Sequence, residues 1–122
     1  MTQDRAADLR LRREYGITLL EYNEVLTYQG GRCAICRRLP DKTRLSVDHC
    51  HRTGLLRGLL CWKCNNAISH FEDSAEKLQK AAIYIMRPPI TQILGVRITA
   101  PGSVGTKKRA KLLKKLNAIT ND

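Results

Sequence analysis

Three residues near the middle of the chain combine oxygen ligands for a metal ion with a nearby base. Asp48 and His49 are adjacent, and Asn65 follows sixteen residues later. A carboxylate and an amide oxygen are hard ligands that suit Mg²⁺ bound to a phosphate. A histidine with a pKa near neutrality can take a proton from water. The residue types indicate metal-assisted phosphate chemistry, although each also has a structural interpretation: Asp48 capping a turn, His49 supporting a metal site and Asn65 capping a helix.

Two pairs of cysteines flank this set. Cys33 and Cys36 form the first pair, Cys61 and Cys64 form the second, and 24 residues lie between the pairs. Two such pairs are typical of a four-thiolate zinc site, whereas a redox pair needs no second copy and the spacing does not favour an iron–sulfur cluster. Four protein ligands leave no open position, so we expect a structural zinc ion. It would fix Asp48, His49 and Asn65 relative to one another.

Length and charge limit the class of protein. The chain has 122 residues, which fits one small domain with a tail, and a formal charge of +11. This excess of positive charge favours a polyanionic partner such as nucleic acid. There is no run of 18 apolar residues, no secretory signal is recognisable, and the five cysteines are an odd number. We therefore expect a soluble, cytoplasmic protein that does not bind membranes.

The elements that position the candidate residues can be predicted from local signals. A charged helix over residues 4–15 should stop at Gly16, and a capping box, Thr18 to Glu21, should open a second helix that Gly30-Gly31 ends. Residues 45–51 and 55–60 should form a hairpin. Helices should then begin at Asn65 and after Asp73, the second presenting Leu78, Ala81, Ala82 and Ile85 on one face and ending at Pro88-Pro89.

Strand periodicity raises a problem at the candidate site. In a regular strand Asp48 and His49 would point to opposite faces. Both can serve one site only where a bulge or a strand end interrupts the alternation. We therefore predict such an irregularity at this position.

The sequence resembles the recombination endonuclease VII group of the HNH nucleases, which is found mainly in bacteriophages. The resemblance covers about Tyr15 to Met86. Three segments carry it: QGGRCAIC at 29–36, LSVDHCHRTG at 45–54 and RGLLCWKCN at 57–65. The resemblance implies a small α+β protein with a zinc-stabilised ββα-metal (HNH, His-Me finger) core and flanking helices. It implies Mg²⁺-dependent cleavage of duplex or branched DNA, such as Holliday junctions, with Mn²⁺ as a substitute.

The resemblance also assigns roles residue by residue. Asp48 and Asn65 would hold Mg²⁺, His49 would be the general base and His51 would lie near the scissile phosphate. The zinc ligands would be Cys33, Cys36, Cys61 and Cys64. The sequence departs from the pattern in lacking the middle Asn of HNH, so a backbone carbonyl should orient the His49 imidazole, and Ser69 replaces a typical Gly.

We expect four regions in the chain: N-terminal helices (1–29), a zinc-bound HNH endonuclease core (30–87), a linker or extended segment (88–106) and a basic amphipathic tail (107–122). The extended assignment rests on the apolar, β-prone run at 90–99, which does not match the dimerising region of the family prototype. The remaining residues have simpler interpretations: Cys50 as a small buried residue, Trp62 as a packing residue and the helix tyrosines as core. Candidate DNA contacts are Arg57, Lys63, Lys107, Lys108 and Arg109.

Two other functions fit the zinc site and the charge. A zinc-finger DNA-binding protein without catalysis would leave the Asp-His pair and Asn65 unexplained. An adaptor in a phage packaging or recombination complex would use the tail to dock. A homodimer and such a packaging or recombination protein are the partners left open beside DNA.

Overall fold

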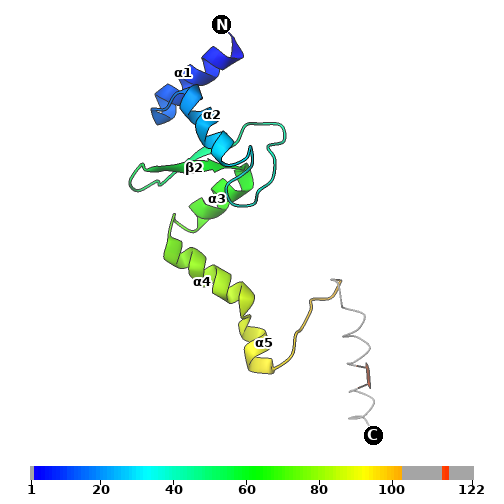
Figure 1. Ribbon diagram of the computed structural model, residues 1–122. Helices are drawn as coiled ribbons and strands as arrows, with labels where there is room; N and C mark the ends of the chain where they lie inside the picture. Colours follow the sequence, from blue (N-terminus) through cyan, green and yellow to red (C-terminus); the bar gives the residue numbers. More distant parts are fainter. Residues whose placement is uncertain (1, 103–113, 116–122) are drawn as a thin grey trace. The chain divides into compact units, whose positions relative to one another are not determined.

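A computed structural model describes residues 2–102 and 114–115 of the chain (Figure 1). The chain divides into two compact units, Met1–Leu78 and Gln79–Asp122. The elements in chain order are α1 (Gln3–Tyr15), α2 (Leu19–Tyr28), β1 (Ser46–His49), β2 (Leu56–Leu60), α3 (Trp62–His70), α4 (Ala75–Met86) and α5 (Pro89–Leu94). The first unit is therefore a small α+β arrangement around one hairpin. No described helix is long and apolar enough to span a membrane.

The junction between α1 and α2 forms as its sequence signals predict. Gly16 ends α1 with φ +74°, and its N–H donates to the Arg12 carbonyl. Thr18 and Glu21 form the predicted reciprocal capping box at the start of α2. Asp8 then accepts a hydrogen bond from the Leu19 N–H at 2.8 Å, which ties α1 to the first turn of α2.

The hairpin contains the predicted irregularity, and the extra residue lies in the return strand. Asp48 of β1 faces Gly58 of β2, while the next residue, His49, faces Leu56. Arg57 is therefore the residue without a partner in the antiparallel ladder. A bulge of this kind bends the strand and redirects side chains, so the hairpin is interrupted beside Asp48 and His49.

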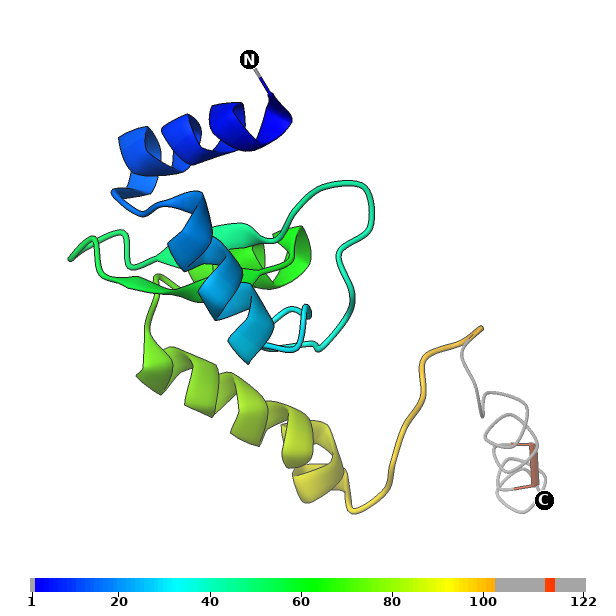
Figure 2. The same ribbon diagram turned by 45° about the horizontal axis from the view of Figure 1, so that its top comes forward.

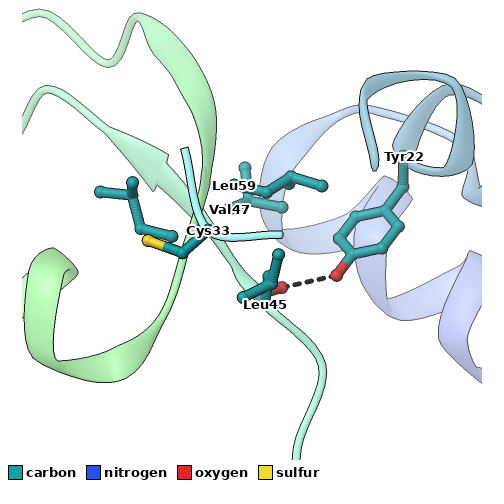
Figure 3. Packing of buried hydrophobic residues seen from close by; sticks show 6 residues of the cluster. Tyr22, Cys33, Leu45, Val47 and Leu59 are labelled. Carbon is teal, nitrogen blue, oxygen red and sulfur yellow. Dashed lines mark hydrogen bonds between the residues drawn. The ribbon is translucent and has the colours of Figure 1, made fainter. Parts of the chain in front are cut away.

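The core of the first unit lies between α2, the hairpin and the first cysteine pair (Figure 3). Its buried residues are Tyr22, Cys33, Leu45, Val47, Leu59 and Leu60. The Tyr22 hydroxyl donates to the Leu45 carbonyl at 2.6 Å, so this tyrosine satisfies its polar end inside the core. The core interpretation of the helix tyrosines holds for Tyr22 but is wrong for Tyr28, which is 90% exposed.

A buried amide joins α2 to β2. The side chain of Gln29 accepts from the Leu59 N–H and donates to the Leu59 carbonyl, both at 2.9 Å, and it also donates to the Arg32 carbonyl. These bonds imitate the pairing of a further strand at the edge of β2. Gly58 leaves room for the arrangement, because a Cβ there would lie 3.2 Å from the Gln29 amide oxygen.

The helices after the hairpin differ from the sequence predictions in three places. α3 begins at Trp62 rather than Asn65, because the Cys61 sulfur caps it by accepting from the Cys64 N–H. Ser74, not Asp73, caps α4, since its hydroxyl accepts from the Lys77 N–H at 3.1 Å. Trp62 is 72% exposed, so the packing role predicted for it is wrong within the described residues.

The β-prone segment after Pro88 is also helical at its start. α5 begins with Pro89 in its first turn and ends at Gly95, which has φ +73°. Proline at a helix start and glycine at its end are strong helix boundaries, and here they outweigh the β-branched residues. The extended assignment is therefore wrong for residues 89–94. On α4, Ile85 of the predicted apolar face is 73% exposed.

Two residues of the predicted C-terminal tail are among the described residues. Of the predicted basic amphipathic segment, only Lys114 and Lys115 are described, and both are helical. Lys107, Lys108 and Arg109 lie outside the described residues. The predicted domain boundaries stay predictions.

Candidate metal centre and active site

Four cysteine sulfurs converge beside the hairpin. The Sγ atoms of Cys33, Cys36, Cys61 and Cys64 all lie within 4.8 Å of one another, and those of Cys36 and Cys61 are 3.7 Å apart. A tetrahedral zinc ion with Zn–S bonds of about 2.3 Å would separate its sulfurs by about 3.8 Å. The donor set and its spacing thus fit a zinc ion. Cys50 is not in the group and is half-buried.

Tight local turns hold the first cysteine pair in place. The Cys33 N–H donates to the Arg38 carbonyl, and the Arg37 N–H donates back to the Cys33 carbonyl. Arg37 takes a left-handed φ of +64° to close this turn. The Ala34 N–H donates to the Leu59 carbonyl at 3.2 Å, which fastens the turn to β2. The first cysteine pair therefore lies beside the end of β2, just before Cys61 begins the second pair.

The thiols of Cys33 and Cys64 have pKa values shifted in opposite directions. Burial opposes ionisation of the Cys33 thiol, but backbone N–H groups, those of Cys61 and Cys36 foremost, lower its pKa to about 6. Burial and the neighbouring cysteine sulfurs raise the pKa of Cys64 to about 12. Ionising all four sulfurs at such short distances is costly, and a bound dication removes that cost.

The Asp48 carboxylate is buried and paired. Its side chain is only 4% exposed. Arg57 binds it with two hydrogen bonds, from Nε at 2.6 Å and from Nη2 at 3.0 Å. Nη2 also lies 3.3 Å from the main-chain oxygen of His49. The bulge residue therefore reaches back to the Asp-His pair.

Asp73 holds the other side of the same arginine. Its Oδ1 accepts from Arg57 Nη2 at 2.7 Å. Its Oδ2 lies 2.9 Å from His51 Nδ1 and accepts from the His51 main-chain N–H at 3.1 Å. The hydrogen bonds from Arg57 and His51 hold the pKa of Asp73 well below its usual range, and the two carboxylates raise the pKa of Arg57.

Asp73 is not predicted in this network by local patterns, because its D-S-A-E segment indicates a helix cap. Asp73 and the preceding Glu72 both adopt φ +57°. Such conformations cost about 1–3 kcal/mol each in a non-glycine residue and persist where surrounding contacts impose them. The one signal in the sequence was that Ser74, next to Asp73, can cap α4 and so leave the Asp73 carboxylate for other contacts.

The two histidine rings of the motif lie together. The ring centroids of His49 and His51 are 4.7 Å apart, and the ring centroid of Tyr15 in α1 lies 6.1 Å from that of His49. His49 is half-buried, whereas the side chain of His51 is 57% exposed. The backbone carbonyl predicted to orient the His49 imidazole is not among the hydrogen bonds of the described residues.

Asn65 occupies the first turn of α3, half-buried, one residue after Cys64. α3 lies against both β1 and β2 (Figure 2), so its first turn is held close to the hairpin. No described contact joins Asn65 directly to Asp48 or His49. Lys63 is exposed on the same turn. The guanidinium of Arg57 is engaged with Asp48 and Asp73, and its Nη1 has no hydrogen bond to the described residues.

Comparison with known proteins identifies the family. A model of the family described as "Recombination endonuclease VII" matches residues 8–87. Two curated relatives are both named "Gene 59 protein": that of Mycobacterium phage D29 is 48% identical over 93 residues and that of Mycobacterium phage L5 is 45% identical over 93 residues. Each match covers 75% of this chain, which spans 56% and 57% of the two relatives. No solved structure matches the chain significantly. The chain belongs to the recombination endonuclease VII family.

Proposed function

We propose that this protein is a metal-dependent DNA endonuclease that hydrolyses phosphodiester bonds. The observation that carries the proposal is the bulged hairpin within the family-matched segment. There, the buried Asp48 and the more accessible His49 lie next to each other, against the helix that carries Asn65. The alternative of a zinc-finger protein without catalysis leaves the Asp-His pair and Asn65 unexplained.

Zinc has a structural role in this proposal. Cys33, Cys36, Cys61 and Cys64 bind the ion, as their spacing of at most 4.8 Å supports. With four protein ligands the ion has no position left for substrate. It joins the turn before β1 to the start of α3 and so stabilises a core of few buried side chains.

Magnesium, with manganese as a substitute, is the proposed catalytic ion, held by Asp48 and Asn65. The local charge fits a cation: one guanidinium faces two carboxylates, so Arg57, Asp48 and Asp73 together carry a net negative charge. When bound, the ion stabilises negative charge on the oxygen that leaves phosphorus.

The remaining steps fall to side chains of the chain itself. His49 takes a proton from the attacking water, and His51, exposed beside it, lies near the scissile phosphate. By analogy with the family, the products carry a 5′-phosphate and a 3′-hydroxyl. Basic side chains hold the flanking phosphates: Arg57 through its Nη1, Lys63, Lys107, Lys108 and Arg109.

The substrate proposed is DNA, duplex or branched, inside the bacterial host of a phage. A formal charge of +11 supports binding to a polyanion, and such binding should weaken steeply with salt because counterions are released. A homodimer and a contact with a packaging or recombination protein remain compatible with this role.

The direct test is incubation of the zinc-loaded protein with supercoiled plasmid and with a four-way junction, in Mg²⁺ or in chelator. Cutting in Mg²⁺ alone supports the proposal, and the ratio of the two substrates separates nicking from junction resolution. DNA binding without cutting in both Mg²⁺ and Mn²⁺ would instead favour a zinc-finger DNA-binding protein. It would favour an adaptor if removal of the tail also abolishes a complex with a packaging or recombination protein.

A further inference from the structure

We propose that Asp73 is a positioning residue of the nuclease site, acting through His51 and Arg57. The inference rests on the proposed function and adds Asp73, to which the sequence resemblance assigned no role. Asp73 lies more than twenty positions after His51 in sequence, yet each of its carboxylate oxygens binds one of these two partners.

The first action of Asp73 is on the His51 ring. An ionised carboxylate can only accept hydrogen bonds, so the 2.9 Å contact with Nδ1 requires a hydrogen on Nδ1. A neutral His51 then has its lone pair on Nε2. The second bond to Oδ2, from the His51 main-chain N–H, fixes the same residue at its backbone. Asp73 thus determines both the tautomer and the placement of this imidazole.

Because His51 is exposed, the Nε2 lone pair of this tautomer is accessible to substrate and water. Its side chain is 57% exposed, so Nε2 can reach a substrate, and the ring centroid lies 4.7 Å from that of His49. A lone pair at Nε2 accepts a hydrogen bond from a water molecule beside the phosphate. Among the described histidines of the motif, His51 is the one whose ring nitrogen is bound by a carboxylate. Asp73 therefore aligns water through His51 while His49 remains the base.

The second action is on Arg57. Asp73 Oδ1 binds Nη2 at 2.7 Å, and the same nitrogen binds Asp48. Asp73 therefore limits the rotation of the guanidinium and keeps it on the Asp48 carboxylate. Loss of this contact would leave Arg57 a flexible partner and Asp48 less fixed.

The backbone around Asp73 is built to deliver this side chain. The Asp73 N–H donates to the Ile68 carbonyl at 3.1 Å, which closes the end of α3. Asp73 itself has φ +57°, a conformation uncommon outside glycine. Ser74 performs the capping of α4, which leaves the Asp73 carboxylate available for His51 and Arg57.

The experiment uses the full-length, zinc-loaded chain with isotope-labelled histidine. Ring ¹⁵N shifts, measured above the end of the His51 titration, give its tautomer. Single-turnover cleavage at saturating DNA gives the rate, and DNA affinity is measured separately. The variants are Asp73→Ala, which removes both actions, and Asp73→Asn, whose amide oxygen can still accept from His51. Glu72→Gln is the matched control, because Glu72 shares the turn but pairs with Lys77.

We expect His51 to be protonated at Nδ1 in the wild type and to lose this preference in Asp73→Ala. The cleavage rate should fall about 10- to 100-fold with DNA affinity within about twofold. Asp73→Asn should keep the Nδ1-protonated tautomer of His51 and should lower the cleavage rate less than Asp73→Ala does. Glu72→Gln should change neither the tautomer nor the cleavage rate. Should Asp73→Ala fail to bind zinc or fold, the wild-type tautomer and Asp73→Asn decide the question.

A wild-type His51 protonated at Nε2, or an Asp73→Ala protein that cuts at the wild-type rate, would overturn the inference. A wild-type protein that does not cut DNA would overturn the proposed function instead. The tautomer of His51 would in that case still decide whether Asp73 orients this ring.

Discussion

The buried carboxylate of Asp48 is bound by two nitrogens of one guanidinium, Arg57 Nε at 2.6 Å and Nη2 at 3.0 Å. Arg57 can do this because it is the extra residue of the β2 bulge. The candidate metal ligand thus has a positively charged partner supplied by the same irregularity that the Asp-His sequence required. The pair makes the placement of the Asp48 carboxylate a property of the hairpin.

Replacing Arg57 should expose the cost of burying Asp48. Leaving the buried Asp48 carboxylate without its hydrogen-bond donors costs about 1–3 kcal/mol, so Arg57→Ala should lower the free energy of unfolding by about that amount. Because the carboxylate would then lack a cation, Mg²⁺ should stabilise the variant more than the wild type. Chemical denaturation with and without Mg²⁺ measures both effects. Arg52→Ala, at an exposed turn residue, is the control, and equal stability of the two variants would contradict the role of the pair.

The four-cysteine cluster should decide whether the chain folds. Structural zinc contributes on the order of 10 kcal/mol, comparable with the whole stability of a small domain. Cys61→Ser removes a ligand and the sulfur that caps α3, so we expect it to lose zinc and helical signal. Cys50→Ser should retain one zinc ion per chain. Zinc content by mass spectrometry and circular dichroism test this, and a folded, zinc-free Cys61→Ser protein would refute the assignment.

Local signals in the sequence predicted much of the first unit. Gly16 and the Thr18–Glu21 capping box predicted the α1–α2 junction because both act within one helical turn. The bulge at Asp48 followed from the need to interrupt strand alternation, and the cysteine spacing predicted the cluster. These features depend on residues close in sequence or on a strict chemical requirement.

Other features depend on tertiary contacts or on local signals that compete with one another. Asp73 resembles a helix cap until Ser74 is seen to fill that place. Arg57 resembles a free phosphate ligand, but the bulge directs it toward Asp48 and Asp73. α5 replaces an expected extended segment because Pro89 and Gly95 define helix ends more strongly than β-branched residues favour a strand. In each case a tertiary contact or a competing local signal prevailed.

The amide of Gln29 should make a measurable contribution to stability. Its side chain forms hydrogen bonds with both main-chain groups of Leu59 and with the Arg32 carbonyl. Gln29→Ala should cost about 2–3 kcal/mol, because buried main-chain groups lose their partners. Asn23→Ala, at an exposed position of α2, should cost little in the same urea titration.

The contact between Gln29 and Gly58 gives a second test of the same arrangement. A Cβ on Gly58 would lie 3.2 Å from the Gln29 amide oxygen. Gly58→Ala should therefore be less damaging in the Gln29→Ala background than alone. Strict additivity of the two changes would show that the two residues are not coupled.

The hydrogen bonds of ionised Asp73 contribute to the stability of the folded state, and acidification should remove this contribution only at low pH. Its folded-state pKa is lowered by the hydrogen bonds from Arg57 and His51. The stabilisation is thus complete above its unfolded-state pKa, about 3.9, and is lost as the pH falls through the folded-state value. The carboxyl ¹³C resonance of Asp73 should not titrate while the protein remains folded. Arg57→Gln should raise the pH at the midpoint of the Asp73 carboxyl titration. A midpoint near 4 in the wild type would contradict the hydrogen bonds from Arg57 and His51.

The proposed role of His49 as the base of a Mg²⁺-dependent DNA endonuclease can be tested by removing its imidazole. The most direct measurement is the single-turnover rate of supercoiled plasmid cutting in Mg²⁺ by the wild type and by His49→Ala, at equal zinc content and saturating DNA. General-base catalysis is worth about 10²–10⁴ in rate, so we expect a loss of at least about 100-fold with DNA binding unchanged. Cutting by His49→Ala at the wild-type rate would contradict the account.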